Sequence, residues 1–182
     1  MSVDPWATLS DERLLKYKVF DVRKTTRRSP RTGEDIGFFV IDTLDWVNVV
    51  AFTPEHELLM IRQYRHGSRD VTLEIPGGVV HEGEDLALAA MRELREETGY
   101  RAERVVRIGS VSPNPALFTN ACATYLAEGC QPDGELIQDP GEDIEVVRVP
   151  WVEVERMVGR GEISHALVVA GLYFYRLHAA PR

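Results

Sequence analysis

Residues 74–100, which read EIPGGVVHEGEDLALAAMRELREETGY, decide the fold of this chain. The stretch opens with a proline and two glycines. These residues are poorly suited to continue a strand, because proline lacks an N–H donor and glycine tolerates unusual dihedral angles. Acidic residues follow at positions 82, 84 and 85, where the positive end of a helix dipole favours negative charge. Gly99 is typical of a helix end. The sequence predicts a glycine turn and then one helix.

The predicted helix carries carboxylates on the flank of an apolar stripe. The stripe recurs at helical spacing and consists of Ala87, Met91, Leu94 and Thr98. At about 100° per residue, Glu93 and Glu97 lie about 40° apart beside it, and Glu96 lies about one turn from Glu93. Like charges at this spacing destabilise a helix, whereas a hard divalent cation with oxygen ligands offsets them. Arg92 is spaced to pair with Glu96. A solvated acidic face is the plain alternative, which the preceding glycine turn and Glu84 argue against.

The spacing of the fixed residues resembles the Nudix box, G-x5-E-x7-R-E-U-x-E-E-x-G-U, where U is bulky and apolar or aromatic. Gly78, Glu84 and residues 92–100 match every defined position, with Tyr100 as the final U. The resemblance implies a Nudix-type α/β/α sandwich with a mixed sheet. It also implies hydrolysis of a nucleoside diphosphate linked to another moiety, with Mg²⁺ or Mn²⁺ as cofactor. The implied metal ligands are Glu93, Glu96, Glu97 and the backbone carbonyl of Gly77, and Glu96 is also a catalytic candidate.

Composition narrows the class of protein. The chain has 182 residues, of which 44% are hydrophobic and 27% charged, as in ordinary globular domains. A net charge of −8 argues against a general nucleic-acid binder, whose binding surface would be basic. Cys122 and Cys130 form no disulfide framework, so we interpret them as packing residues in a reducing compartment. We find no apolar run of about 18 residues and no signal segment, so we expect a cytoplasmic protein without a membrane partner.

Hydrophobic patterning predicts an α/β domain with an N-terminal extension. Residues 6–15 read as a short lead-in, and residues 16–28 and 36–43 as a β-hairpin. Further strands are expected at 46–52, 58–64, 71–75, 105–112, 120–128 and 144–149. A short helix is expected at 151–159, and a closing helix is marked by Ile163, Leu167, Ala170, Phe174 and Leu177. We expect residues 1–44 to form the extension and residues 45–182 to form the hydrolase domain.

The predicted hairpin carries large apolar side chains that need a partner. An isolated hairpin is marginal in water, and its edges favour aggregation. The protein's own core is one possible partner. In similar proteins that cleave ADP-ribose, an extension of this kind commonly builds the dimer, so we expect a homodimer.

Other residues resemble the Nudix branch that cleaves ADP-ribose and nucleoside diphosphate sugars. That branch carries a similar QYR segment before an E-x-P-x-G turn, and here Arg65 and, less surely, Arg62 are candidates to contact the diphosphate. Glu74, in the turn, is either a supporting acidic group or a plain edge residue. Pro115 resembles a proline that marks this branch. Trp46 is the candidate for stacking on a base, although aromatic residues at such spacing are more often core.

Glu142, in an acidic loop, is the candidate for a further metal ligand or for the base that activates water, and Glu145 is the second candidate. Four histidines show no ligand spacing and receive no role: His56, His66, His81 and His165. Two alternatives stay open. One is a Nudix hydrolase of nucleoside triphosphates or dinucleotides, and the other is a non-catalytic regulator that binds nucleotide sugars. The intact glutamates argue against the regulator, because binding alone does not need a water-activating cluster.

Overall fold

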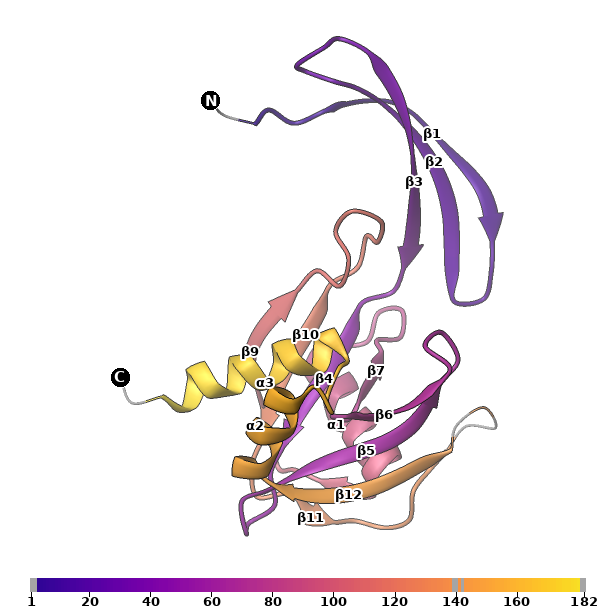
Figure 1. Cartoon of the computed structure of the whole chain (residues 1–182). Coiled ribbons are helices and arrows are strands. Elements are labelled where there is room, and N and C mark those ends of the chain that lie inside the picture. Colours follow the sequence, from indigo (N-terminus) through magenta and orange to yellow (C-terminus); the bar gives the residue numbers. More distant parts are fainter. Residues whose placement is uncertain (1–2, 139–140, 142, 181–182) are drawn as a thin grey trace. The chain divides into compact units, whose positions relative to one another are not determined.

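The structure is a computed structural model, and it describes residues 3–138, 141 and 143–180. The chain divides into two compact units. Figure 1 draws the whole chain, coloured from the N-terminus to the C-terminus. The first unit is Met1–Leu44 with Ser112–Asn120, and the second is Asp45–Val111 with Ala121–Arg182. We describe each unit by itself.

The first unit contains an antiparallel sheet of three strands in the order β1-β2-β3 (Figure 1). The strands are β1 (Ala7–Lys16), β2 (Phe20–Arg28) and β3 (Asp35–Thr43). The predicted hairpin corresponds to β2 and β3, but the lead-in prediction was wrong, because residues 7–16 form a strand. All ten residues of β1 are exposed, so pairing with β2, not burial, holds this strand. A strand without a buried face leaves little periodic signal in the sequence.

The second unit contains two larger sheets. One has the order β7-β4-β10-β9, in which β4 and β10 run parallel and the other pairs antiparallel. Its strands are β4 (Trp46–Ala51), β7 (Gly77–Val79), β9 (Val105–Val111) and β10 (Cys122–Ala127). The other sheet is antiparallel with the order β12-β5-β6, formed by β5 (Glu57–Arg65), β6 (Asp70–Glu74) and β12 (Ile144–Pro150). A short pair joins β8 (Tyr100–Arg101) to β11 (Gln131–Pro132).

Three helices cover the sheets: α1 (Leu86–Thr98), α2 (Trp151–Arg160) and α3 (Ala166–Ala179) (Figure 1). Alternate residues of β4 pack into different cores, as the period of two in a strand requires. Val47 and Val49 lie in one core with Leu94 of α1, whereas Val50 lies in the other with Leu172 of α3. This arrangement is the predicted α/β/α sandwich with a mixed sheet, so the fold prediction is confirmed.

The stripes predicted on the two long helices are confirmed in part, because Leu94 and Thr98 of α1 and Ile163 before α3 are buried and the other members are not. The fully buried residues of α1 are Ala89, Ala90, Leu94, Glu97 and Thr98, whereas Ala87 and Met91 are half-buried. Those of α3 are Val168, Gly171, Leu172 and Tyr175, whereas Leu177 is exposed. Periodicity defines a helix and an apolar side. The sheets against which each helix packs select the residues that are fully covered.

The glycine turn also contains a strand that we did not predict. Gly77–Val79 forms β7, which pairs with the start of β4. A Cβ added to Gly77 would lie 2.2 Å from the backbone oxygen of Val47, so only glycine allows this approach. Pro76 separates β7 from β6, and its carbonyl accepts a hydrogen bond from Val49 N (2.8 Å). Pro76 therefore follows the end of β6 and is not part of a strand, as expected, but Gly77 and Gly78 after it pair with β4.

Both cysteines are buried and free. Burial raises the pKa of Cys122 to about 12 and that of Cys130 to about 11, so both thiols stay protonated and serve as packing groups. Free cysteines fit the predicted cytoplasmic location, which stays a prediction. None of the helices in the described ranges has both the length and the apolar character that crossing a membrane requires.

Candidate active site

Helix α1 begins and ends as the sequence predicted. The side chain of Asp85 accepts hydrogen bonds from Ala87 N (2.9 Å) and Leu88 N (3.2 Å), which caps the first turn. Gly99 ends the helix in the left-handed conformation, with φ of 69°. These local signals fix which residues of the stretch are helical and therefore where its glutamates lie.

Two glutamates of α1 lie against the glycine turn. Glu97 is only 5% exposed, and its Oε2 accepts a hydrogen bond from Gly77 N at 2.7 Å. A Cβ added to Gly78 would lie 2.5 Å from Oε1 of Glu93, so the absence of a side chain leaves room for that carboxylate. The turn and the helix therefore place a backbone amide and two carboxylates together.

Arg92 connects the other acidic residues of the stretch. Its Nη1 donates to Glu93 Oε1 (2.8 Å) and to Glu96 Oε2 (3.0 Å), which confirms the predicted pairing with Glu96. Its Nε and Nη2 donate to the two carboxylate oxygens of Glu84 at 2.9 and 3.0 Å. Hydrogen bonds from Arg92 are the main cause that lowers the pKa of Glu84 to about 2. Three carboxylates therefore surround one guanidinium group, and the cluster keeps an excess of negative charge.

The donor set at this end of α1 fits a hard divalent cation. Glu93, Glu96 and Glu97 offer only oxygen atoms, which Mg²⁺ and similar ions prefer. Within the described residues, no three His, Cys, Asp or Glu side chains are already gathered as a metal-holding group. Glu93 and Glu96 instead contact Arg92, and Glu97 contacts Gly77. Metal binding would therefore need these carboxylates to turn from protein donors towards a shared ion.

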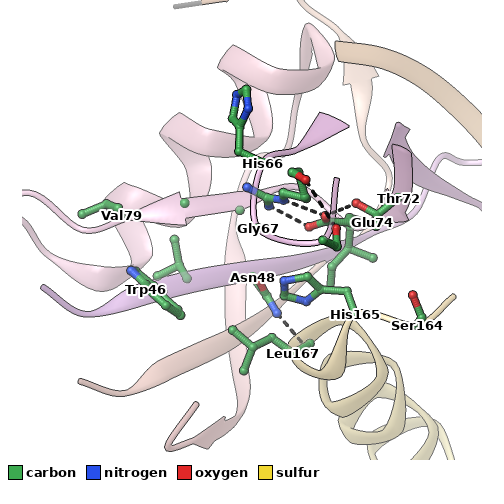
Figure 2. A pocket seen from close by; sticks show the side chains of 16 residues that line it. Trp46, Asn48, His66, Gly67, Thr72, Glu74, Val79, Ser164, His165 and Leu167 are labelled. Atoms are coloured by element: carbon green, nitrogen blue, oxygen red, sulfur yellow. Dashed lines mark hydrogen bonds and ion pairs between the residues drawn. The ribbon is translucent and has the colours of Figure 1, made fainter. Parts of the chain in front are cut away.

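A cavity of about 610 Å³ lies on the other side of the glycine turn, a volume in the range of small-molecule sites. Its walls come from β4, the β5–β6 hairpin, the glycine turn and the start of α3 (Figure 2). Two of the predicted binding residues, Trp46 and Arg65, line it. Gly77 and Gly78 also line it, so the cavity wall includes the residues that lie against Glu97 and Glu93.

One wall of the cavity contains a buried ion pair. Glu74 is 2% exposed and accepts two hydrogen bonds from Arg65, from Nε and Nη2, both at 2.8 Å (Figure 2). Thr72 donates a third at 2.6 Å. Burial acts to raise the pKa of Glu74, but the hydrogen bonds from Arg65 and Thr72 outweigh it, and the pKa is lowered. Of the two readings of Glu74, the structure favours the supporting acidic group over the plain edge residue. The predicted contact between Arg65 and a diphosphate stays a prediction.

The structure does not bring the remaining predicted residues to the cavity lining. Arg62 and Glu145 are register partners across β5 and β12, joined at 3.0 Å, with exposed side chains. Pro115 belongs to the first unit, whereas the cavity lies in the second. Glu142 lies outside the described residues, so its predicted role as base or ligand stays a prediction.

Sequence reasoning missed several polar residues of the cavity. Asn48 lies on β4 and donates through Nδ2 to the backbone oxygen of Leu167 at 3.0 Å. It is the one polar residue of the strand WVNVVA, and that break in an apolar strand was a usable signal. His66 and His165, to which we assigned no role, also line the cavity (Figure 2). They come from distant segments, so no spacing pattern joins them.

Comparison with known proteins identifies the class to which this fold and site belong. The model of the NUDIX domain matches residues 43–172, and the chain belongs to this family. An ADP-ribose pyrophosphatase of Bacillus subtilis (strain 168) is 27% identical over 95% of this chain and 94% of its own. One of Mycobacterium tuberculosis (strain ATCC 25618 / H37Rv) is 30% identical over 94% and 84%. A solved structure titled as an ADP compounds hydrolase shares the fold, with a TM-score of 0.86, 23% identity, and coverage of 98% of this chain and 96% of that chain.

These findings confirm the predicted membership of the Nudix hydrolases. They also agree with the predicted fold, because the structural match extends over both units of the chain.

Proposed function

We propose that this protein hydrolyses the diphosphate bond of ADP-ribose or a related nucleoside diphosphate sugar. The products would be a nucleoside monophosphate and a sugar phosphate. The observation that carries the proposal is that Gly77 and Gly78 line the cavity and also lie against the carboxylates of α1. A diphosphate at these glycines would leave the rest of the molecule in the cavity. The names of the relatives support the same substrate class.

We assign Mg²⁺ or Mn²⁺ as the cofactor. Its ligands would be Glu93, Glu96, Glu97 and the carbonyl of Gly77, with Glu142 as a further candidate. A bound divalent ion neutralises phosphate charge and lowers the pKa of a coordinated water. Arg92 orients Glu93 and Glu96 for this task, and the amide of Gly77 orients Glu97.

In the reaction, a water oxygen bonds to one phosphorus as the bond from that phosphorus to the bridging oxygen breaks. A carboxylate takes the proton of the water, and Glu142 and Glu145 are the candidates. Glu145 is joined to Arg62 on the exposed side of β12, so we favour Glu142.

The described ends of the acidic loop support this choice. Gln138 exchanges two hydrogen bonds with the backbone of Ile144, at 3.0 and 3.4 Å, which brings the two ends of the loop together. The amide of Ile137 donates to the carbonyl of Glu96 at 3.0 Å. The described start of the loop therefore contacts α1 at Glu96, one of the proposed ligands.

The remaining binding roles follow from the cavity. Trp46 lines it and is proposed to stack on the base, and Arg65 lines it and is proposed to contact the diphosphate. Arg62 and Pro115 remain weaker candidates, because neither belongs to the lining residues that the structure describes.

A substrate panel tests the proposal. The purified protein is assayed with Mg²⁺ and with Mn²⁺ against ADP-ribose, other nucleoside diphosphate sugars, NADH, dinucleoside polyphosphates and nucleoside triphosphates. The products are identified by mass spectrometry. We expect the highest kcat/KM for a nucleoside diphosphate sugar. A higher value for a triphosphate or dinucleotide would favour the first alternative. Binding without turnover of any compound would favour a regulator.

We also propose that the protein is a homodimer formed through the sheet of the first unit. Large apolar side chains on or beside its strands are exposed, among them Leu9, Leu14, Leu15, Val19, Phe38 and Phe39. A three-stranded sheet with exposed apolar side chains and a fully exposed outer strand, β1, favours self-association, and a two-fold partner is the usual solution.

Light scattering at micromolar concentration tests the dimer. We expect a dimeric full-length protein and a monomeric Phe39→Lys variant. Tyr173→Lys on α3 is the matched control, since Tyr173 and Phe39 are similarly exposed, at 59% and 58%. A monomeric and fully active wild-type protein would exclude a required dimer. A chain starting at Asp45 that stays a folded, active dimer would place the interface elsewhere.

A further inference from the structure

One buried polar atom in the cavity wall has no protein partner. In the part of the chain that the structure describes, three buried side-chain polar atoms make no hydrogen bond: Thr25 Oγ1, Asn120 Oδ1 and His165 Nδ1. Of the three, only His165 belongs to the cavity lining. A buried polar group without a partner destabilises the fold, and native proteins keep few of them. The atom is therefore placed where a ligand can supply the hydrogen bond.

A role in starting the helix does not explain this side chain. His165 occupies the position that precedes α3, where a polar side chain usually caps the first turn. It makes no such bond, whereas Asp85 in the same position of α1 makes two, at 2.9 and 3.2 Å. Figure 2 shows the imidazole extending from the start of α3 towards the strand that carries Asn48.

The charge of the surrounding wall indicates which kind of ligand group His165 meets. Arg65 pairs with Glu74 through two hydrogen bonds, and no other Asp, Glu, Lys or Arg occurs among the described lining residues. Glu74 offsets the positive charge of Arg65, which we propose contacts the diphosphate. The other polar side chains of the lining, such as Asn48 and Ser164, are neutral and lie among apolar residues.

We propose that His165 is a positioning residue, whose Nδ1 hydrogen-bonds an uncharged group of the bound nucleotide sugar. The inference rests on the proposed function for its substrate class. Sugar hydroxyls and base nitrogens are both uncharged partners for an imidazole. The diphosphate would lie at Gly77 and Gly78, so a contact from His165 would fix how the rest of the molecule lies relative to the reacting bond.

Three substitutions of His165 separate this role from a structural one. Asparagine keeps a polar atom near the position of Nδ1, glutamine keeps one near Nε2, and leucine keeps neither. Binding of ADP-ribose to the full-length protein is measured by isothermal titration calorimetry in EDTA, so that no hydrolysis occurs. We expect Kd to rise about tenfold in His165→Leu and His165→Gln, and to stay within about twofold of wild type in His165→Asn. The Tm of His165→Leu should not fall, because the change removes an unpaired polar atom.

Fragments and a control variant complete the experiment. Pyrophosphate should bind equally to all variants, and loss of binding for AMP or for ribose 5-phosphate will identify the half of the substrate that His165 contacts. His178→Leu is the matched control, because His178 lies exposed on the same helix. It should bind ADP-ribose as wild type does.

Several outcomes would overturn the inference. They are unchanged binding in His165→Leu, equal binding by the asparagine and glutamine variants, a fall in Tm that accompanies the loss, weaker binding of pyrophosphate, and no binding of ADP-ribose by the wild-type protein. The proposed function fails separately. A wild-type protein with the expected binding pattern that hydrolyses no nucleoside diphosphate sugar with Mg²⁺ or Mn²⁺ would contradict the activity and leave the role of His165 intact.

Discussion

Two arginines of the second unit are each bound to carboxylates, but in different proportions. Arg92 contacts three glutamates, whereas Arg65 contacts the carboxylate of Glu74 through two parallel hydrogen bonds. The first cluster keeps an excess of negative charge, and the second is balanced. The same pair of residue types therefore produces a region suited to a cation and, across the glycine turn, a neutral wall suited to an uncharged group.

The largest effect is expected where the negative charge is in excess. Glu97→Gln removes a charged oxygen ligand but keeps an acceptor for Gly77 N, so turnover should fall at least about a hundredfold with little change in Tm. Steady-state kinetics with the best substrate of the panel measures this effect. Glu82→Gln, at an exposed position before the helix, is the control and should keep wild-type turnover. A wild-type rate in Glu97→Gln would show that the metal site lies elsewhere.

The next effect concerns stability and its pH dependence. The folded pKa of Glu84 is about 2 and its ordinary value is 4.5, so its charged form stabilises the fold above about pH 4.5. This stabilisation is lost as the pH falls from 4.5 towards 2. Glu84→Gln should therefore lower the free energy of unfolding by about 2–3 kcal/mol at neutral pH.

Urea denaturation of both proteins between pH 2 and pH 7 measures this difference. The gap between them should close as the pH approaches the folded pKa of Glu84, about 2. A gap that stays constant over the whole range would show that the charge of Glu84 is not the cause.

A smaller loss is expected from the balanced pair. Arg65→Ala removes two donors from the buried carboxylate of Glu74 and keeps the hydroxyl of Thr72, so it should lower the free energy of unfolding by about 2 kcal/mol. Arg62→Ala is the matched comparison, because its partner Glu145 is exposed, and should change the free energy by less than about 1 kcal/mol. Equal losses in the two variants, measured by urea denaturation, would mean that the burial of Glu74 contributes little.

The two clusters were not equally predictable. All the members of the Arg92 cluster come from residues 84–96, so helical spacing was sufficient to predict the pairing of Arg92 with Glu96. Arg65 and Glu74 are partners because β5 and β6 are adjacent antiparallel strands. The spacing of residues along the sequence does not predict which side chains meet across two strands. The strand β1 was missed for a related reason, since all its residues are exposed and only pairing with β2 holds it.

The sequence by itself determined the box helix, its limits and the family. Asp85 and Gly99 act through hydrogen bonds within one turn of the chain, so their effect can be read from neighbouring letters. Only the tertiary structure decided the cavity, the strand at Gly77–Val79 and the position of His165. For example, the hydrogen bond from Asn48 to Leu167 in the wall of the cavity joins residues that are 119 positions apart in the sequence. Contacts at such separation depend on how sheets and helices pack, and that packing also chose which side of each helix is buried.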